Sequence, residues 1–345
     1  QIFDATAIHA LELLAASLHG MLTSSANKWF SLRFKETELN GIDEAKEWLE
    51  DATSRMYDAI AKSNFQQEIF ECYFDLIAFG TACLMIEEDQ EDTLLFSARH
   101  IKEIYIQENK KGFVDTIYRK FKMPVQAVID KFGADNVSKD TLISFKKSPF
   151  EELTLVHVAR PRFDFDSKKK DKQNMPVESI YFEFESGHIV SIGGFNEMPY
   201  VIPRYLKAST EVYGRSPGMN ALPDVKVLNK MVENGLKAAA KQIDPPLLVP
   251  DDGMLAPIRM SPGSINFFRS GSRERIEPLQ INANTNVSLN NENQRRDAIA
   301  KMFHVDQLLI TENRNMTATE VLQRNEEKMR ILGPVLGRLQ SELLS

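Results

Sequence analysis

The chain has 345 residues, of which 43% are hydrophobic and 26% charged, a composition typical of a folded protein of roughly two domains. No run approaches the roughly 18 apolar residues of a membrane span. Residues 213–345 carry 17 Lys and Arg and 15 Asp and Glu, a net charge of +2. Because the whole chain has a net charge of −7, residues 1–212 carry −9. Without a concentrated basic patch, a conventional sequence-reading DNA-binding protein is excluded.

The N-terminal segment predicts an amphipathic helix, because apolar residues recur at alternating spacings of four and three. The expected stripe is Phe3, Ala7, Leu11, Leu14, Leu18 and Met21. The segment has no basic leader and carries acidic residues, so it is not a signal peptide. Since the chain lacks an initiator Met, we expect it to be part of a longer protein.

Residues 43–89 predict one or two helices that turn strand-like after Gly80. The expected core residues of these helices are Trp48, Met56, Ile60, Ile69, Tyr73 and Leu76. Residues 93–121 and 153–206 predict mainly strands, with Gly112 and Gly187 at hairpin turns. A short helix is expected over 124–133, and residues 167–174 are a charged, solvated loop. Residues 1–212 therefore predict an α+β domain.

A long helix is predicted to begin at Ser216 as N-cap and Pro217 as first helical residue, and to end at Asp244 before two prolines. Its length is about 40 Å. Its expected apolar stripe is Leu222, Val225, Leu228, Val232, Leu236 and Ala239. The next helix, 287–304, is polar nearly all round, so it must pack on another helix or on a neighbouring subunit.

The last helix is predicted to begin with a capping box from Thr317 to Glu320. Apolar spacings of three and four then form a heptad-like seam. Its members are Leu322, Asn325, Met329, Leu332, Leu336, Leu339 and Leu343. We expect a kink at Gly333-Pro334, and further helix beyond Ser345, because the pattern reaches the end without a cap.

The pentapeptide GRSPG (214–218) matches the nucleophile elbow of serine hydrolases. In that motif the oxyanion hole uses the backbone N–H of the residue after the serine, and here that residue is Pro217, which has none. An N-cap role explains the same residues, and we favour it over a catalytic role for Ser216. We therefore expect no catalytic residue, although a hydrolase using Ser216 remains the enzyme alternative.

Cofactor and metal motifs are missing from the sequence. No Gly-Lys dipeptide exists for a Walker site, and no His-Glu-x-x-His motif for zinc. Asp164 and Asp166 could imitate a two-carboxylate metal site, but alternating strand residues before a basic loop explain them better. Cys72 and Cys83 are too few for a disulfide scaffold and are expected to be buried free thiols.

Two polar segments attract interest. The short loop 309–315 carries Glu312 and Arg314 near its tip, although an ordinary helix–helix turn accounts for its composition. The segment 245–285 between the two long helices carries Arg269, Arg273 and Arg275. By themselves these arginines would form a solvated face.

The order of these parts resembles the portal proteins, or head-to-tail connectors, of short-tailed bacteriophages. The best matching stretch is YGRSPGMNALPDVKVLNKMVENGLKAAAKQIDPPLLVPDDG (213–253), followed by TENRNMTATEVLQRNEEKMRILGPVLGRLQSELL (311–344). LAASLHGMLTSSANKWFSLRF (14–34) and WLEDATSRMYDAIAKSNFQQEIFECYFDLIAFGTACLMIEED (48–89) match as well. The resemblance covers almost the whole chain.

The resemblance implies a portal fold built from named segments. Residues 1–212 would be the α+β wing, 213–244 the first stem helix, 245–285 a small β-containing clip and 286–305 the second stem helix. Residues 306–316 would be the tunnel loop, and 317–345 the helix entering the crown. Portals of this family form rings, usually of twelve subunits, at one capsid vertex.

The same resemblance implies partners and contact residues. DNA would be pumped through the channel by a separate terminase ATPase, and tail adaptors, capsid and scaffolding proteins would bind the ring in the virion after assembly in the host cytoplasm. The tunnel loop residues facing double-stranded DNA, without sequence specificity, would be Thr311, Glu312, Asn313, Arg314 and Asn315. The clip residues facing the terminase and adaptors would be Asp251, Asp252, Arg269, Arg273 and Arg275. No cofactor, metal or membrane is implied, and another head–tail adaptor ring is the structural alternative.

Overall fold

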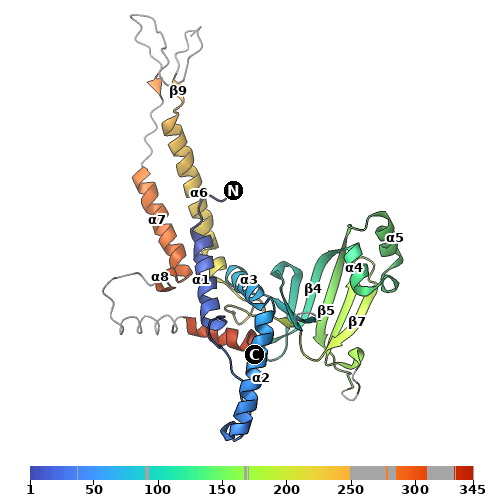
Figure 1. The fold of residues 1–345 in the computed structure, drawn as a ribbon. Coiled ribbons are helices and arrows are strands. Elements are labelled where there is room, and N and C mark those ends of the chain that lie inside the picture. The colour runs from blue at the N-terminus through green and yellow to red at the C-terminus, as the bar shows by residue number, and fades with distance from the viewer. Residues whose placement is uncertain are drawn as a thin grey trace, which may run out of the picture. The chain divides into compact units, whose positions relative to one another are not determined.

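The computed structural model describes residues 1–36, 38–89, 93–166, 169, 171–248, 277–278, 285–308, 330 and 332–344. The chain forms two compact units, each assembled from segments far apart in the sequence. The helical unit comprises Gln1–Ala7 and Leu222–Lys301, and the mixed unit comprises Ile8–Ala221 and Met302–Ser345. The structure combines helices with antiparallel sheets, so the predicted α+β class is confirmed (Figure 1).

Most of the described residues of the helical unit belong to a pair of long helices, and its described strands are two short ones. They are α6 (Pro217–Ile243), α7 (Thr285–Met302), β9 (Leu247–Leu248) and β10 (Glu277–Pro278). The predicted end points of the long helices agree with the structure to within two residues. Among the described residues, no helix is both long and apolar enough to cross a membrane.

The mixed unit holds most of the shorter elements. Its helices are α1 (Thr6–Leu22), α2 (Asp43–Lys62), α3 (Phe65–Phe79), α4 (Val125–Phe132), α5 (Lys139–Lys147) and α8 (Val305–Leu308), with 3₁₀ turns at Leu39–Gly41, Ile101–Glu103, Ala134–Asn136 and Lys172–Asn174. Its strands are β1 (Leu84–Asp89), β2 (Thr93–Ala98), β3 (Ile104–Glu108), β4 (Val114–Pro124), β5 (Glu152–Pro161), β6 (Val177–Glu183), β7 (Ile189–Phe195) and β8 (Tyr200–Val201). Residues 332–342 are also helical.

Five strands form an antiparallel sheet in the order β3-β4-β5-β6-β7, and a smaller sheet has the order β2-β1-β8. The predicted hairpin glycines are confirmed: Gly112 has φ 80° and Gly187 has φ 66°, values that side chains with a Cβ rarely adopt. Successive residues of a strand point to opposite faces, so each strand of the large sheet contributes to an inner and an outer face.

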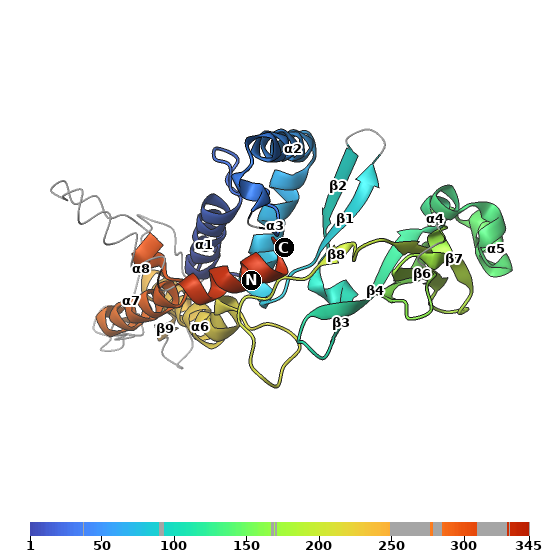
Figure 2. The same cartoon turned by 90° about the horizontal axis from the view of Figure 1, so that it is seen from below.

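The inner face of the large sheet carries the core. Near one end Ile104, Ile117 and Ala159 pack with Cys83 and Met85 of the smaller sheet layer. A further cluster joins strand residues to α4 and the segment before α5. Its buried members are Phe121, Val128, Val137, Leu155, Tyr181 and Val190. Figure 2 shows α4 and α5 near one another at the end of this sheet away from β1 and β2.

His157 is a fully buried polar residue in the middle of this core. Its imidazole is hydrogen bonded to the Tyr200 hydroxyl at 2.6 Å and to the Ser179 hydroxyl at 2.9 Å, and it stacks on the Tyr181 ring at 3.9 Å. Burial lowers the pKa of His157 to about 3. The ring is therefore neutral at ordinary pH, as its two hydroxyl partners allow.

The helical core is only partly the predicted one. Leu14, Leu18, Ile69, Tyr73 and Leu76 are fully buried as expected. The prediction was wrong for two residues of α2, since Trp48 remains 61% exposed and Met56 44% exposed. The Trp48 ring stacks on the Phe34 ring, with 6.0 Å between centroids, but this contact leaves most of the Trp48 side chain exposed. The helix is therefore apolar over a wider arc than this chain covers.

Other departures are local. Helix α5 was not predicted, and it begins where the Ser138 hydroxyl accepts a hydrogen bond from the Thr141 N–H. The explanation of Asp164 and Asp166 as alternating strand residues was wrong, because β5 ends at Pro161. Helical structure continues through Gly333 and Pro334.

Gly80 marks a close backbone approach in the mixed unit. It ends α3 in the left-handed conformation with φ 81°, and its N–H donates to the Leu76 carbonyl at 2.8 Å. A Cβ at Gly80 would overlap the carbonyl of Gly214 and lie 2.8 Å from the carbonyl carbon of Arg215. The segment that leads into α6 therefore requires glycine at this position.

We expect Gly80→Ala to lower the free energy of unfolding by at least about 2 kcal/mol, because strain in the left-handed region adds to a backbone overlap. Urea denaturation measures this change. The matched control is Gly20→Ala, in helix α1, where an added Cβ meets no atom within 4 Å. That control should be neutral or slightly stabilising. Equal effects of the two substitutions would contradict the close approach.

Candidate functional site

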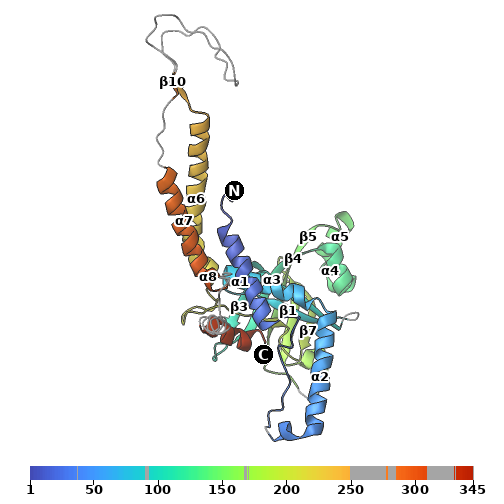
Figure 3. The same cartoon turned by 60° about the vertical axis from the view of Figure 1, so that its left-hand side comes forward.

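The long helices α6 and α7 lie alongside one another within the helical unit (Figures 1 and 3). Leu228 of α6 and Ile299 of α7 are buried. Gly235 leaves room beside α6, since a Cβ there would come 3.5 Å from the Glu292 carboxylate of α7. Two residues of the predicted α6 stripe, Leu222 and Leu236, are instead exposed. The apolar surface of α6 is therefore wider than the strip that α7 covers.

Charged contacts fix this helix pair. The Arg295 guanidinium of α7 pairs with the Asp224 carboxylate of α6. The N-terminal segment adds Asp4, whose carboxylate lies 3.0 Å from Arg296 of α7, while the Phe3 N–H donates to the Asn229 side chain of α6 at 2.6 Å. Burial raises the pKa of Asp4, but hydrogen bonds from Thr6 and Arg296 outweigh it and hold the pKa below its usual value. The nearly all-polar α7 is thus held by ion pairs as much as by apolar packing.

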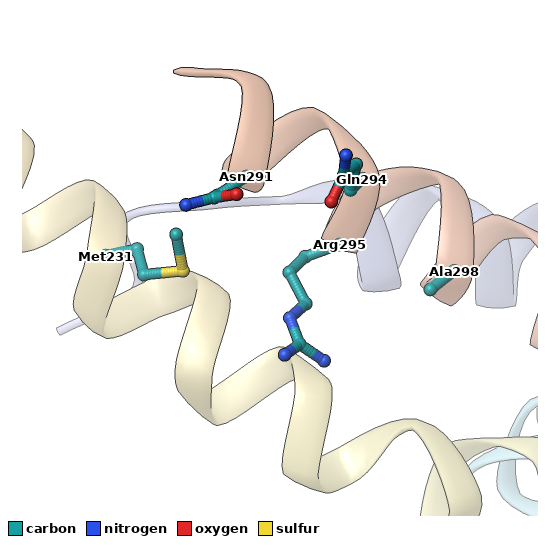
Figure 4. A pocket seen from close by; sticks show the side chains of 5 residues that line it. All are labelled: Met231, Asn291, Gln294, Arg295 and Ala298. Carbon is teal, nitrogen blue, oxygen red and sulfur yellow. The ribbon is translucent and has the colours of Figure 1, made fainter. Parts of the chain in front are cut away.

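A shallow cavity of about 470 Å³ lies between the two helices (Figure 4). Its lining residues are Met231, Asn291, Gln294, Arg295 and Ala298. Among these described lining residues there is no carboxylate and no histidine, the side chains that most often act as general bases. We therefore read the cavity as imperfect packing of a polar helix.

A band of lysines runs along the exposed side of α6. At 3.6 residues per turn, its four members fall within about 60° of the helix circumference and span about 22 Å. They are Lys226, Lys230, Lys237 and Lys241. Glu233 is the acidic residue among them, and hydrogen bonds from Lys230 and Lys237 lower its pKa to about 2. The band is positively charged overall, a property that suits contact with phosphates.

In the segment between α6 and α7, the structure describes only residues 244–248 and 277–278. There β9 pairs antiparallel with β10, with Leu248 opposite Glu277 and Leu247 opposite Pro278. The five residues predicted to face the terminase and adaptors lie outside the described residues. They are Asp251, Asp252, Arg269, Arg273 and Arg275.

The predicted DNA-facing loop also lies outside the described residues, namely Thr311, Glu312, Asn313, Arg314 and Asn315. The described residues nearest to it, up to 308 before it and from 330 after it, belong to the mixed unit. On the near side Phe303 and Leu308 are buried, and His304 turns the chain with φ 58°. On the far side the predicted seam residues Leu332, Leu336, Leu339 and Leu343 are buried.

Arg204 holds the C-terminal helical residues 332–342 through Glu342. It is 1% exposed, and all five of its guanidinium N–H groups have acceptors. The Glu342 carboxylate of the C-terminal helix accepts at 2.7 and 3.2 Å, the carbonyls of Gly112 and Val212 at 2.9 and 3.1 Å, and Glu108 completes the set. Burial lowers the pKa of Arg204, but the hydrogen bonds that it donates to Glu342 and Glu108 outweigh this effect, so the pKa is raised. Sequence reasoning missed this residue, because nothing in PRYL (203–206) distinguishes a buried arginine from a surface one.

Ser216 is an N-cap in the structure. Its hydroxyl oxygen accepts a hydrogen bond from the Met219 N–H at 2.9 Å and donates one to the Ala78 carbonyl at 2.9 Å. The residue is 1% exposed. A hydroxyl that is buried and used in both directions is a poor nucleophile, so the geometry does not favour the hydrolase alternative.

Metal and thiol chemistry find little support in the part of the chain that is described. Within it, no three His, Cys, Asp or Glu side chains gather where they could hold a metal ion. Cys72 and Cys83 are buried free thiols, as predicted, and burial raises the pKa of both, to about 12 for Cys83.

Comparison with known proteins identifies the class. A family model described as "Bacteriophage head to tail connecting protein" matches residues 1–345, and the chain belongs to this family. It is 32% identical to the "Probable portal protein" of Bordetella phage BPP-1 over 99% of this chain and 63% of that protein. It is 31% identical to the "Portal protein" of Salmonella phage epsilon15 over 100% of this chain and 64% of that protein. The chain thus spans less than two thirds of the length of these relatives.

Among solved structures, a chain from "Virion of native gene transfer agent (GTA) particle" is similar, with a TM-score of 0.40 and 11% identity over 83% of this chain and 69% of that chain. At this level the likeness carries no argument about the fold or the site.

We expect Ser216→Ala to lower the free energy of unfolding by about 1 to 2 kcal/mol, because the N-cap hydrogen bond is lost. Ser54→Ala, at an exposed position in the middle of α2, is the matched control and should change stability by less than about 0.5 kcal/mol. Urea denaturation measures both. If the unsubstituted protein hydrolysed an ester and Ser216→Ala did not, the N-cap interpretation would be wrong.

Proposed function

We propose that the protein is a portal that forms a ring at one capsid vertex, serves as the channel for genome packaging and ejection, and docks the packaging motor and tail adaptors. The observation that carries the proposal is membership of the head-to-tail connecting family over the whole chain, with portal proteins among its relatives. The predicted segments then take their roles, with the wing at 1–212, the stem helices at 213–244 and 286–305, and the crown helix at 317–345.

Ring formation is supported by the helix pair. Helix α7 presents little apolar surface, and α6 keeps Leu222, Leu236 and Ile243 exposed. Contacts with identical neighbours around a closed ring would cover such surfaces without leaving free ends. We propose a ring of twelve subunits, following the family.

DNA contact is proposed for the tunnel loop at 306–316. Its support is the placement of buried anchors on both sides, which would hold a short polar loop in place. The lysine band of α6 supplies a positive surface that phosphates could meet. Because phosphate contacts carry no sequence information, such a channel would let any double-stranded DNA pass.

The clip at 245–285 is proposed to bind the terminase large subunit during packaging and tail adaptors afterwards. It leaves the helix pair through the short β9–β10 ladder, and loops held on a rigid support often carry recognition. We further propose that the protein is not an enzyme, that it is a virion component contacting capsid and scaffolding proteins, and that it assembles in the host cytoplasm. The buried, doubly hydrogen-bonded Ser216 supports the non-enzymatic role.

We expect purified protein to form closed rings with a central channel in electron micrographs of negatively stained particles. The physical reason is the exposed apolar surface of the helix pair. A ring that differs in size from a portal ring and has no axial channel would favour a head–tail adaptor. Sedimentation that finds only monomers at micromolar protein and moderate salt would count against any ring.

We expect Arg314→Ala to leave rings intact but to reduce packaging or retention of DNA whatever its sequence, because a phosphate contact is removed. The measurement is packaged genome per capsid, compared with the unsubstituted protein. Arg330→Ala, a described exposed arginine beyond the loop, is the matched control. If Arg314→Ala and a deletion of the loop tip both retain full genomes, the loop is only a turn.

A further inference from the structure

The outer face of the five-stranded sheet has an apolar centre that no described helix covers. Strand register places Tyr105, Tyr118, Val158, Ile180 and Ile192 in one row across all five strands. Tyr105 is 57% exposed, Tyr118 37% and Ile192 48%, whereas Val158 in the middle of the row is only 7% exposed. Antiparallel sheets that face water normally alternate apolar-in and polar-out. A row of tyrosines and aliphatics across the outer side is therefore unusual for a surface that meets only solvent.

The charges around this row are already paired. Lys122 lies 2.9 Å from Glu152, and Arg160 lies 2.7 Å from Glu178. The Lys120 ammonium sits 3.3 Å from the centre of the Phe184 ring. The face thus presents an apolar centre with a charged rim. The three cations and two carboxylates named above give this rim a net charge of +1.

Helix α2 has the complementary character. At 3.6 residues per turn, five apolar residues fall within about 80° of its circumference. They are Ala45, Trp48, Ala52, Met56 and Ala59. This stripe includes Trp48 and Met56, which the sequence pattern assigns to a core and which this chain leaves exposed. The helix carries six acidic and three basic residues, a net charge of −3.

The two surfaces lie on opposite sides of the same unit. The inner face of the large sheet packs on the layer that contains β1 and β8, and α2 and α3 contact this smaller sheet from beyond it. In Figure 2, α2 and the large sheet are seen on either side of β1 and β2. Helix α2 therefore cannot reach the outer face of its own sheet, but a second copy can bring its own α2 there.

The apolar row of the sheet and the apolar stripe of α2 also agree in length. Five strands spaced about 4.8 Å apart make a row about 19 Å wide. The α2 stripe from Ala45 to Ala59 is about 21 Å long. A helix lying across the strands would cover the tyrosine row with its apolar stripe.

We propose that α2 of one subunit packs on the outer face of the β3–β7 sheet of the next subunit, with Trp48 as the central anchor. This inference rests on the proposed ring, because such a contact joins two different surfaces head to tail and closes only by rotation. The acidic flank of α2 then faces the basic rim of the sheet.

Cysteine cross-linking tests the contact in the full chain. The double variant Ala52→Cys/Tyr118→Cys places one thiol on each surface, while native Cys72 and Cys83 are buried. A flexible bismaleimide should then join subunits into a ladder of dimers, trimers and larger species. The matched control is Ala52→Cys/Phe150→Cys, since Phe150 is exposed but outside both surfaces. It should give no ladder.

The outcomes separate this contact from the proposed function. Rings in micrographs without a ladder in the Ala52→Cys/Tyr118→Cys variant would overturn the contact and leave the portal role standing. Dimers from Tyr118→Cys alone would also overturn it, since they indicate two sheet faces packed on one another. Absence of rings in the unsubstituted protein would overturn both proposals.

A substitution gives an independent measurement. Trp48→Ala should raise the protein concentration needed for ring formation at least about tenfold, as expected for loss of a central aromatic anchor. Phe150→Ala should leave that concentration unchanged. The urea midpoint of the monomeric fraction should be the same in both variants, because Trp48 is 61% exposed within the chain. An unchanged assembly concentration for Trp48→Ala would overturn the proposal.

Discussion

Arg204 is the residue through which the C-terminal helix is held to the body of the mixed unit. Its guanidinium joins the hairpin between β3 and β4, the segment before α6 and Glu342 near the end of the chain. A buried arginine with every donor satisfied is stable, whereas loss of one carboxylate partner would leave an uncompensated charge in the interior. The same pairing lowers the pKa of Glu108, whose burial is outweighed by hydrogen bonds from Lys207 and Arg204.

This constraint matters because of where it lies in the chain. Residues 309–329 lie outside the described residues, and the described segments before and after them belong to the mixed unit. Buried Phe303 and Leu308 hold the segment before them, and the Arg204 cluster holds the helical residues 332–342 after them. Supports of this kind are what the proposed channel loop would require.

Residues that are apolar in sequence but exposed in one chain recur on both units. Leu222 and Leu236 lie on α6, Trp48 and Met56 on α2, and Tyr105 on the outer sheet face. Single exposed apolar residues need no explanation, but rows and stripes do. Contacts between copies in the proposed ring would cover surfaces of this kind.

The sequence alone determined the local elements. Periodicity and end signals located α1, α3, α6 and α7, because Ser216, Pro217 and Gly80 act on their immediate neighbours and need no tertiary partner. The same local logic identified Ser216 as a cap, and the order of the segments indicated the family. The α+β class followed from the same local patterns.

Only the tertiary structure decided which residues far apart in sequence meet. Arg204 reaches Glu342, and the N-terminal Asp4 reaches Arg296. No spacing rule connects such pairs, because their proximity depends on how whole elements pack. For the same reason the sequence pattern assigned Trp48 to a core. Periodicity shows that a helix face is apolar, but not whether its own chain or a neighbouring one covers it.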